Sequence, residues 1–146
     1  HVGADELKLL KKTKTVLIHC PTSNAPIEER GLGSGLFDFK KTERAGVRWA
    51  LGSDIGGGPF LSMLDVMASF VAQNRRAKRS GATFVKALYR ATLAGAQILG
   101  VDKRTGNLRA GKDANFVVLK GPRGKYTSAE TLLEALLTSI EAREHY

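Results

Sequence analysis

Asp54 stands where a carboxylate can take part in chemistry. It follows the apolar-rich run 47–51, whose sequence VRWAL predicts a short buried strand, and the glycine run 56–58 comes directly after Ile55. In barrel and open α/β folds, active sites form at the carboxyl ends of the parallel strands. An unpaired carboxylate in a protein core costs roughly several kcal/mol, so we do not expect Asp54 to be a core residue. It caps a turn, pairs with a cation or holds a metal ion.

A helix is predicted beyond the glycines, over residues 62–79. Ser62 is suited to be its N-cap, and Asp65 takes the place of the usual Glu or Gln of a capping box. Strand, carboxylate, glycine turn and helix thus form one unit. The apolar side chains of the helix recur on one face, which we expect to be buried: Leu64, Met67, Ala68 and Val71.

The other reactive side chains give weaker indications. Cys20 is the only cysteine in the sequence, which excludes an intrachain disulfide and a CxxC metal site and fits a reducing, cytoplasmic setting. Cys20 and His19 are neighbours on the predicted strand 15–20, so their side chains point to opposite faces and do not form a nucleophilic pair. We interpret Cys20 as a small buried thiol and His19 as a structural histidine that makes hydrogen bonds.

Two further motifs fail on their spacing. Gly31, Gly33 and Gly35 form the pattern GxGxG, which lacks the third-glycine spacing of a dinucleotide site, and no GxxxxGK phosphate loop occurs. The HxE and PCxxC motifs of the zinc-dependent nucleoside deaminase fold are also absent from the sequence. Neither phosphate binding nor that fold is therefore predicted.

The composition is that of a globular protein with a basic balance. Of the 146 residues, 42% are hydrophobic and 25% are charged, and the formal net charge is +9. The basic residues are spread along the chain except in the cluster 75–79, which falls at the end of a predicted helix, where cations offset the helix dipole. We predict a solvated helix end there and no nucleic-acid site. No apolar run of 18 residues occurs, and we expect no membrane association.

The order of the predicted elements indicates an α/β fold. Their alternation up to residue 100 is typical of parallel βα units. No crossover helix follows the last predicted strand, which indicates a second, small β domain, so we divide the chain into residues 1–100 and 101–146. The chain begins with His1 rather than Met, and we expect it to be a piece of a longer protein. The predicted elements are helix 5–12, strand 15–20, loop 21–35, helix 36–45, strand 47–51, helix 62–79, helix 82–99, strand 115–119 and helix 129–143.

Four sequence blocks, taken in order, resemble a known family. They are residues 19–24 (HCPTSN), residues 32–37 (LGSGLF), residues 52–64 (GSDIGGGPFLSML) and residues 91–114, which contain ATLAGA, GNL and GKDA. Together they resemble the C-terminal half of the metal-dependent amidohydrolases and, within that superfamily, the guanine deaminases. The first three blocks are specific as a set, whereas the GKDA block occurs across the superfamily.

The resemblance implies the C-terminal part of a distorted TIM (β/α)₈ barrel, together with part of a small β-sandwich domain. It implies a zinc site made of a His-x-His on the first barrel strand, a His on the fifth and an Asp on the eighth, and Asp54 matches that Asp. In such enzymes the Asp also takes a proton from the attacking water. His1 resembles the histidine at the end of the sixth strand, which hydrogen-bonds this water. The implied reaction is hydrolytic deamination of guanine to xanthine and ammonia.

The resemblance also implies what must come from elsewhere. The His-x-His, the fifth-strand His and the Glu that protonates the ring nitrogen have no counterpart here, where the only further histidine is His145. We therefore expect the chain to be inactive alone, to require the N-terminal half of the same enzyme, to act there on a small purine and to form a homodimer. Two alternatives stay open. One is an amidohydrolase acting on a different heterocycle, such as another aminopurine, a pyrimidine or a triazine, and the other is a non-enzymatic basic binding module.

Overall fold

Two short parallel strands lie at the centre of the fold. The computed structural model describes residues 2–139, and in it β1 (Leu17–His19) pairs in parallel with β2 (Trp49–Leu51). Leu17 lies opposite Trp49 and His19 lies opposite Leu51, so the two strands end at the same level. Parallel strands need a crossover connection, which here contains α2 (Phe39–Arg44). The predicted α/β order with parallel strands is confirmed. That the chain forms the C-terminal part of a distorted barrel and part of a β-sandwich stays a prediction.

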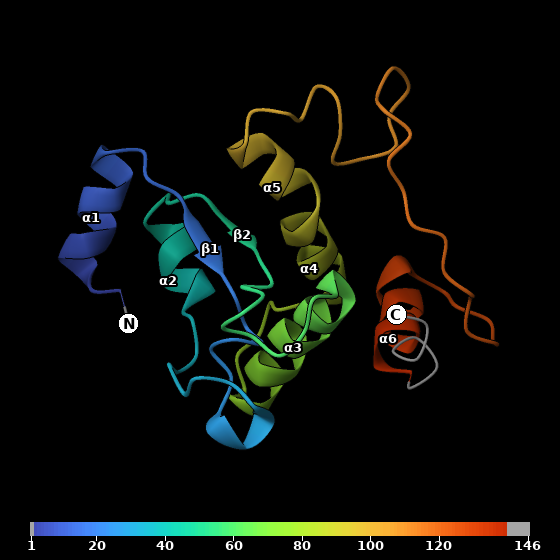
Figure 1. Ribbon diagram of the computed structural model, residues 1–146, viewed down its shortest axis with the longest axis horizontal. Helices are drawn as coiled ribbons and strands as arrows, with labels where there is room; N and C mark the ends of the chain where they lie inside the picture. The colour runs from blue at the N-terminus through green and yellow to red at the C-terminus, as the bar shows by residue number, and fades with distance from the viewer. Residues whose placement is uncertain (1, 140–146) are drawn as a thin grey trace.

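Helices lie on both sides of this sheet. In Figure 1, α1 and α2 lie on one side of the strands, and α3, α4 and α5 lie on the other. The last helix, α6, packs against α3 and α4 after a long stretch without helix or strand. The remaining bounds are α1 (Ala4–Lys12), the 3-10 turn η1 (Ile27–Glu29), α3 (Met63–Arg76), α4 (Phe84–Ala91), α5 (Leu93–Ile98) and α6 (Ala129–Thr138).

Helix α3 begins where the sequence predicts. The backbone N–H of Leu64 donates to Ser62 Oγ at 3.1 Å, which confirms Ser62 as the N-cap. The helix ends at Arg76, three residues earlier than predicted, because Lys78 adopts a left-handed backbone conformation with φ 54°. Of the four side chains predicted to be buried, Met67, Ala68 and Val71 are buried and Leu64 is only partly buried. Phe70 lies on the buried side as well and reaches the strands through His19 and Trp49.

An aromatic cluster fills the space between the sheet and the helices. Phe70 of α3 is 0% exposed, and its ring centroid lies 5.4 Å from that of Phe39 and 5.7 Å from that of Trp49. Both distances are in the range in which aromatic rings attract beyond the burial of their area. The cluster therefore joins α2, β2 and α3 and fixes the position of the strand that leads to Asp54.

A charged network ties the outer helices to β2. The Glu43 carboxylate of α2 accepts hydrogen bonds from Lys86 Nζ at 3.0 Å and from an Arg90 guanidinium nitrogen at 2.8 Å. Arg90 also donates to the backbone carbonyl of Trp49 at 2.9 Å and lies 4.3 Å above its ring centroid. Partial burial raises the pKa of Glu43, but the hydrogen bonds from the two cations outweigh this effect and lower it. These contacts hold α2 and α4 together and fix α4 against β2.

The predicted helix 82–99 is two helices in the structure. Thr92 interrupts it with φ −125° and ψ −90°, and α5 starts at the next residue. The Thr92 hydroxyl donates to the carbonyl of Leu88 at 2.6 Å, so the side chain competes with the backbone for that acceptor. No glycine or proline stands at this break. The one glycine of the predicted helix, Gly95, lies inside α5.

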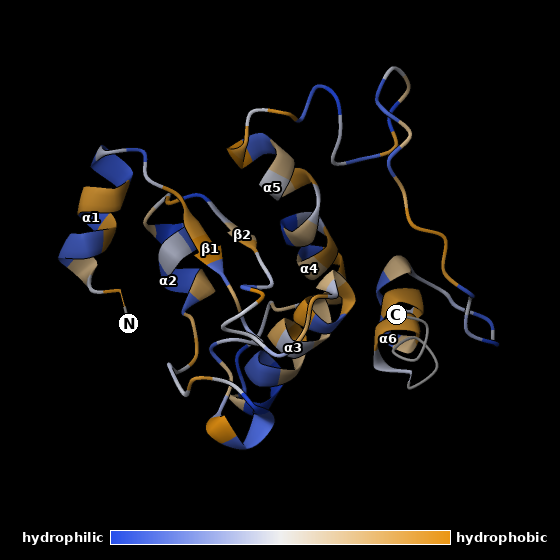
Figure 2. Cartoon of the chain, in the orientation of Figure 1, coloured by the Kyte–Doolittle hydropathy of each residue, from blue (hydrophilic) through white to orange (hydrophobic). Residues whose placement is uncertain are grey.

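The predicted strand 115–119 is not formed within residues 2–139. Its residues have no strand partner there, and Val117 and Val118 are 72% and 82% exposed. Figure 2 shows this segment as an orange stretch between the turn-rich part after α5 and the start of α6. The apolar, β-branched composition that predicted a strand needs a neighbouring strand to pair with. The division into two domains therefore stays a prediction.

Helix α6 is held by the start of α4. The Glu130 carboxylate accepts hydrogen bonds from the backbone N–H groups of Phe84 and Val85, at 2.8 and 2.9 Å. An acidic side chain at a helix N-terminus satisfies free N–H groups and interacts favourably with the helix dipole.

Within the part of the chain that the structure describes, no helix is both long enough and apolar enough to cross a membrane.

Candidate active site

Asp54 lies beyond the end of β2, in a tight turn made of glycines. Its backbone has φ +51°, a left-handed conformation that Asp and Asn adopt more readily than most residues. Its carbonyl oxygen accepts hydrogen bonds from the N–H groups of Gly57 and Gly58, at 2.9 and 2.7 Å. The side chain is exposed to solvent. The turn therefore presents a carboxylate at the carboxyl end of a parallel strand, as the sequence predicted.

The carboxylate itself makes a different contact. Ser23 Oγ donates to Asp54 Oδ2 at 2.7 Å, and Ser23 is 1% exposed. Ser23 follows β1 at a distance similar to that at which Asp54 follows β2. Since the two strands end at the same level, the residues after them meet above the same edge of the sheet. Sequence reasoning missed Ser23: its place shortly after β1 indicates the same edge of the sheet but does not indicate a hydrogen bond with Asp54.

The Asp54 carboxylate takes no part in the hydrogen bonds of the glycine turn. The two turn hydrogen bonds go to the Asp54 main-chain carbonyl, while the side chain accepts its hydrogen bond from Ser23. Among the described residues, the carboxylate thus makes no hydrogen bond that closes the glycine turn. An Asp whose task is to cap a turn uses its side chain for this purpose. The arrangement favours the other interpretations of Asp54, a cation partner or a metal ligand.

His19 is buried beside this edge of the sheet. It is 3% exposed, and its ring lies 4.7 Å from the Phe37 ring centroid and 6.0 Å from that of Phe70. Neither ring nitrogen has a hydrogen-bond partner within residues 2–139, so the prediction of a hydrogen-bonding histidine is wrong for the described residues. Burial lowers the pKa of His19 from 6.5 to about 4, which makes the ring neutral at pH 7. It is a core histidine packed between aromatic rings.

This burial predicts an acid-sensitive stability. Below pH 6.5 the unfolded chain binds a proton at His19, whereas the folded chain does so only near its pKa of about 4. Stability from this site is therefore fully present above pH 6.5 and is lost as pH falls toward 4. We expect a His19→Phe variant of this protein to lose less melting temperature than wild type between about pH 7 and 4.5. Equal losses in the two proteins would contradict this account.

Cys20 remains a protonated thiol. Its side chain is partly buried, and burial raises its pKa, as does the negative charge of Asp54. A reactive cysteine needs the opposite shift, since the thiolate is the nucleophile. The prediction that His19 and Cys20 form no nucleophilic pair agrees with this environment.

The basic cluster 75–79 is largely engaged within the chain. Arg75 pairs with Glu134 of α6, an Arg76 guanidinium nitrogen lies 3.1 Å from Glu29 Oε2, and Arg79 donates to the carbonyl of Phe37. Cations that contact nucleic acid have to be free to reach phosphates. The arrangement supports a helix end that is tied to its neighbours.

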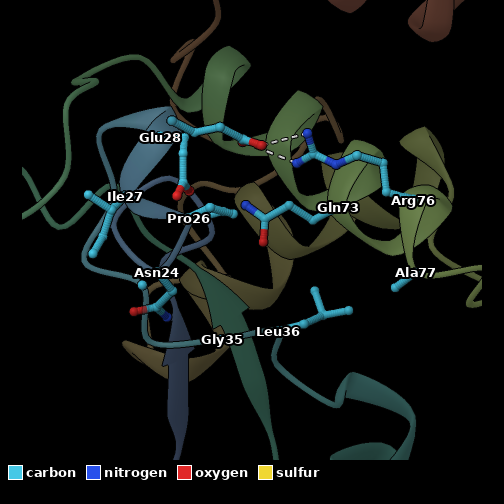
Figure 3. Close-up of a pocket in the computed structure, with 11 residues that line it drawn as sticks. Asn24, Pro26, Ile27, Glu28, Gly35, Leu36, Gln73, Arg76 and Ala77 are labelled. Carbon is cyan, nitrogen blue, oxygen red and sulfur yellow. Dashed lines mark hydrogen bonds and ion pairs between the residues drawn. The ribbon is translucent and has the colours of Figure 1, made fainter.

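A pocket away from Asp54 lies beside α3. It has a volume of about 620 Å³ and lies between the loop after β1 and the C-terminal half of α3. Figure 3 shows Gln73 facing Pro26, and dashed lines join the Arg76 guanidinium to a glutamate of the loop. Gln73 Nε2 donates to the carbonyl of Pro21 at 2.7 Å, and Arg76 pairs with Glu29. Because these polar groups already have partners and Asp54 is not in the lining, we assign the pocket no chemical role.

No metal cluster is complete within residues 2–139. No three His, Cys, Asp or Glu side chains gather there in a way that could hold a metal ion. His1, the second predicted catalytic residue, and His145 lie outside the described residues. Catalytic zinc takes three protein ligands and keeps an open position. Asp54 is suited to supply one of these ligands, with Oδ2 held by Ser23 and Oδ1 without a hydrogen bond from any described residue.

Comparison with known proteins shows the family to which this fold belongs. The model of the amidohydrolase family matches residues 1–143, and the chain belongs to this family. A curated protein from Deinococcus radiodurans, named probable guanine deaminase, is 39% identical over 137 residues, which are 92% of this chain and 30% of that protein.

Solved structures give the same picture. Guanine deaminase from Escherichia coli superposes with a TM-score of 0.82 and 32% identity, covering 94% of this chain and 33% of that one. A structure described as an adenosine deaminase from Xanthomonas campestris with bound Zn has a TM-score of 0.64 and 27% identity, covering 78% of this chain and 26% of that one. The chain thus spans about a third or less of the length of these relatives.

Proposed function

We propose that this chain is the C-terminal part of a zinc-dependent purine deaminase that hydrolyses guanine to xanthine and ammonia. The observation that carries the proposal is Asp54, an exposed carboxylate at the end of a parallel strand, in a chain similar over most of its length to proteins named guanine deaminase. The proposal places the remaining barrel strands and metal ligands in the N-terminal half of the same polypeptide. The assembled enzyme is a cytoplasmic homodimer in this proposal.

The proposal gives Asp54 two tasks. As a ligand it contributes one carboxylate oxygen to zinc, and the donor set of this chain fits a single ligand of that kind. Zinc, when bound, acts as a Lewis acid that lowers the pKa of water toward 7. As a general base, Asp54 accepts the proton of the water that attacks the ring carbon bearing the amino group. Asp54 then returns this proton to the amino nitrogen, the C–N bond breaks, ammonia leaves and the water oxygen stays on the ring.

His1 has the role of a hydrogen-bond partner of the attacking water in this proposal. No described residue takes over that role, since His19 is buried between aromatic rings and Cys20 is a protonated thiol. The chain therefore supplies proton acceptance at Asp54, while recognition of the purine ring falls mainly to residues outside this chain.

A second substrate is supported by one observation. The Xanthomonas campestris structure, similar in fold and 27% identical, is described as an adenosine deaminase with bound Zn. The same scaffold therefore fits the alternative of an amidohydrolase acting on another heterocycle. The non-enzymatic basic module gains no support, because three of its clustered arginines are engaged within the chain.

The test is a substrate panel on the intact enzyme with its metal. Guanine, adenine, adenosine, cytosine and a chlorotriazine are assayed for released ammonia or chloride, and zinc is measured per protomer. We expect guanine to be hydrolysed with a kcat/KM at least about 100-fold above the other four, since sites that hydrogen-bond a substrate reject analogues lacking those groups. Preference for any other member of the panel would replace guanine as the substrate, and absence of turnover on all five would contradict the proposal.

A further inference from the structure

Ser23 makes the one hydrogen bond to the Asp54 side chain that the described residues provide. Its Oγ lies 2.7 Å from Asp54 Oδ2, across 31 residues of sequence, and Ser23 is 1% exposed. The backbone around it is fixed: Asn24 N donates to the carbonyl of Cys20 at 2.9 Å, and Leu32 N donates to the carbonyl of Ser23 at 2.7 Å. The hydroxyl is thus held at a defined point above the sheet edge.

We propose that Ser23 is the positioning residue of Asp54. By holding Oδ2, it fixes the rotation of the carboxylate and directs Oδ1 toward the reacting centre. The inference rests on the proposed function of Asp54 and names the residue that prepares it. Groups that hold a metal-binding side chain in place are known to influence metal affinity and activity through it.

The glycine turn is shaped to allow this contact. A Cβ at Gly57 would lie 3.0 Å from Asp54 Oδ2, and a Cβ at Gly58 would lie 3.3 Å from both the Cβ and the backbone nitrogen of Ser23. Any larger residue at these positions would therefore press on the bonded pair. The turn leaves room for the carboxylate and the hydroxyl side by side.

A buried hydroxyl alone does not explain the bond. The neighbouring Thr22 is 3% exposed, and its Oγ1 has no hydrogen-bond partner within residues 2–139. Within these residues the Thr22 hydroxyl is therefore buried without a partner, whereas the hydroxyl of the next residue, Ser23, donates to Asp54. Thr22 is also a matched control, because Thr22→Val removes a hydroxyl at the same loop without touching the carboxylate.

The experiment compares four variants of the intact enzyme: Ser23→Ala, Thr22→Val, Asp54→Ala and the Ser23→Ala/Asp54→Ala double variant. Zinc affinity is measured by competition with a chelator, alongside kcat, KM and the melting temperature. For Ser23→Ala we expect zinc affinity and kcat to fall by about 10–100-fold each, with KM within about threefold of wild type. Thr22→Val should stay within about twofold in all of these measurements.

The double variant separates positioning from simple structural support. If Ser23 acts through Asp54, Ser23→Ala changes zinc affinity by less than about twofold once the carboxylate is absent. An equal loss in both backgrounds, or a Ser23→Ala enzyme that behaves like Thr22→Val, would overturn the inference. If Ser23→Ala does not fold, Ser23→Cys takes its place, because a thiol is similar in size and a weaker donor. The inference then requires smaller losses of zinc affinity and kcat that again disappear when Asp54 is absent.

The two proposals fail in distinguishable ways. If Asp54→Ala keeps wild-type zinc affinity and guanine turnover, the role of Asp54 is wrong, and the positioning role falls with it. If Asp54→Ala loses both while Ser23→Ala loses neither, the proposed function stands and the positioning role alone is wrong.

Discussion

Replacing Asp54 with Asn in the intact enzyme should lower kcat for guanine by about 10²–10⁴-fold, the usual contribution of a general base. Asn keeps the size of the side chain and tolerates the left-handed backbone at this position, where φ is +51°. The glycine turn should be unaffected, since the Asp54 main-chain carbonyl accepts its hydrogen bonds. What is lost is the negative charge, and with it proton acceptance and one anionic metal ligand.

Steady-state guanine turnover, zinc content and thermal melting check this expectation together. With zinc removed from both proteins, the melting temperature should remain within about 2 °C of wild type, because the hydrogen bond from Ser23 has an acceptor in Asn as well. Turnover within about threefold of wild type would return Asp54 to the class of ordinary turn residues. A large fall in melting temperature would show that the charge has a structural task that the described contacts do not reveal.

The largest effect on stability is expected from Phe70→Ala. Phe70 is 0% exposed, and its ring contacts those of Phe39, Trp49 and His19 from three different elements. Truncating a buried Phe typically costs about 3–5 kcal/mol, from lost transfer energy and from the cavity that remains. Since whole domains are stable by only about 5–15 kcal/mol, this variant should lose a large part of its stability.

Urea unfolding of the intact enzyme measures the free energy change. Phe60→Ala is the matched control, because Phe60 is 37% exposed and lies outside the aromatic cluster, with the Arg30 guanidinium 5.9 Å from its ring centroid. We expect about 1 kcal/mol or less for this control. Similar losses for the two variants would mean that the aromatic cluster does not form the core of the assembled enzyme.

The central unit of the fold was predictable because its signals are local. The apolar run before Asp54, the glycines after it and the Ser62 cap each act within a few residues, and the structure shows all three where they were expected. The parallel pairing of β1 and β2 followed from the alternation of strands and helices. The observed strands are shorter than predicted, at three residues each.

Features that depend on distant contacts were not predictable from the sequence. The break at Thr92 carries no glycine or proline, and the hydroxyl of Ser23 finds Asp54 across 31 residues. The histidine at position 19 looked like a hydrogen-bonding residue because polar groups usually are, yet its neighbours in space are phenylalanines. For Ser23 and His19 the decisive partner is far away in the chain, and residue types alone do not name it. For Thr92 the partner is the nearby Leu88, but a threonine inside a predicted helix does not by itself indicate a break.

The hydrogen bonds at the base of the loop after β1 determine where this loop can accept insertions. Leu32 N donates to the Ser23 carbonyl and Gly33 N donates to the Ala25 carbonyl, so two backbone hydrogen bonds close the loop at its base. Gly31 is required there, because a Cβ at this position would lie 2.2 Å from the Ala25 carbonyl oxygen. Residues added at the tip, around η1, would extend outward at a cost of only about 0.6 kcal/mol per doubling of loop length. Ser23 and Asp54 would keep their places, so the tip of this loop can take up added residues without moving the contact between them.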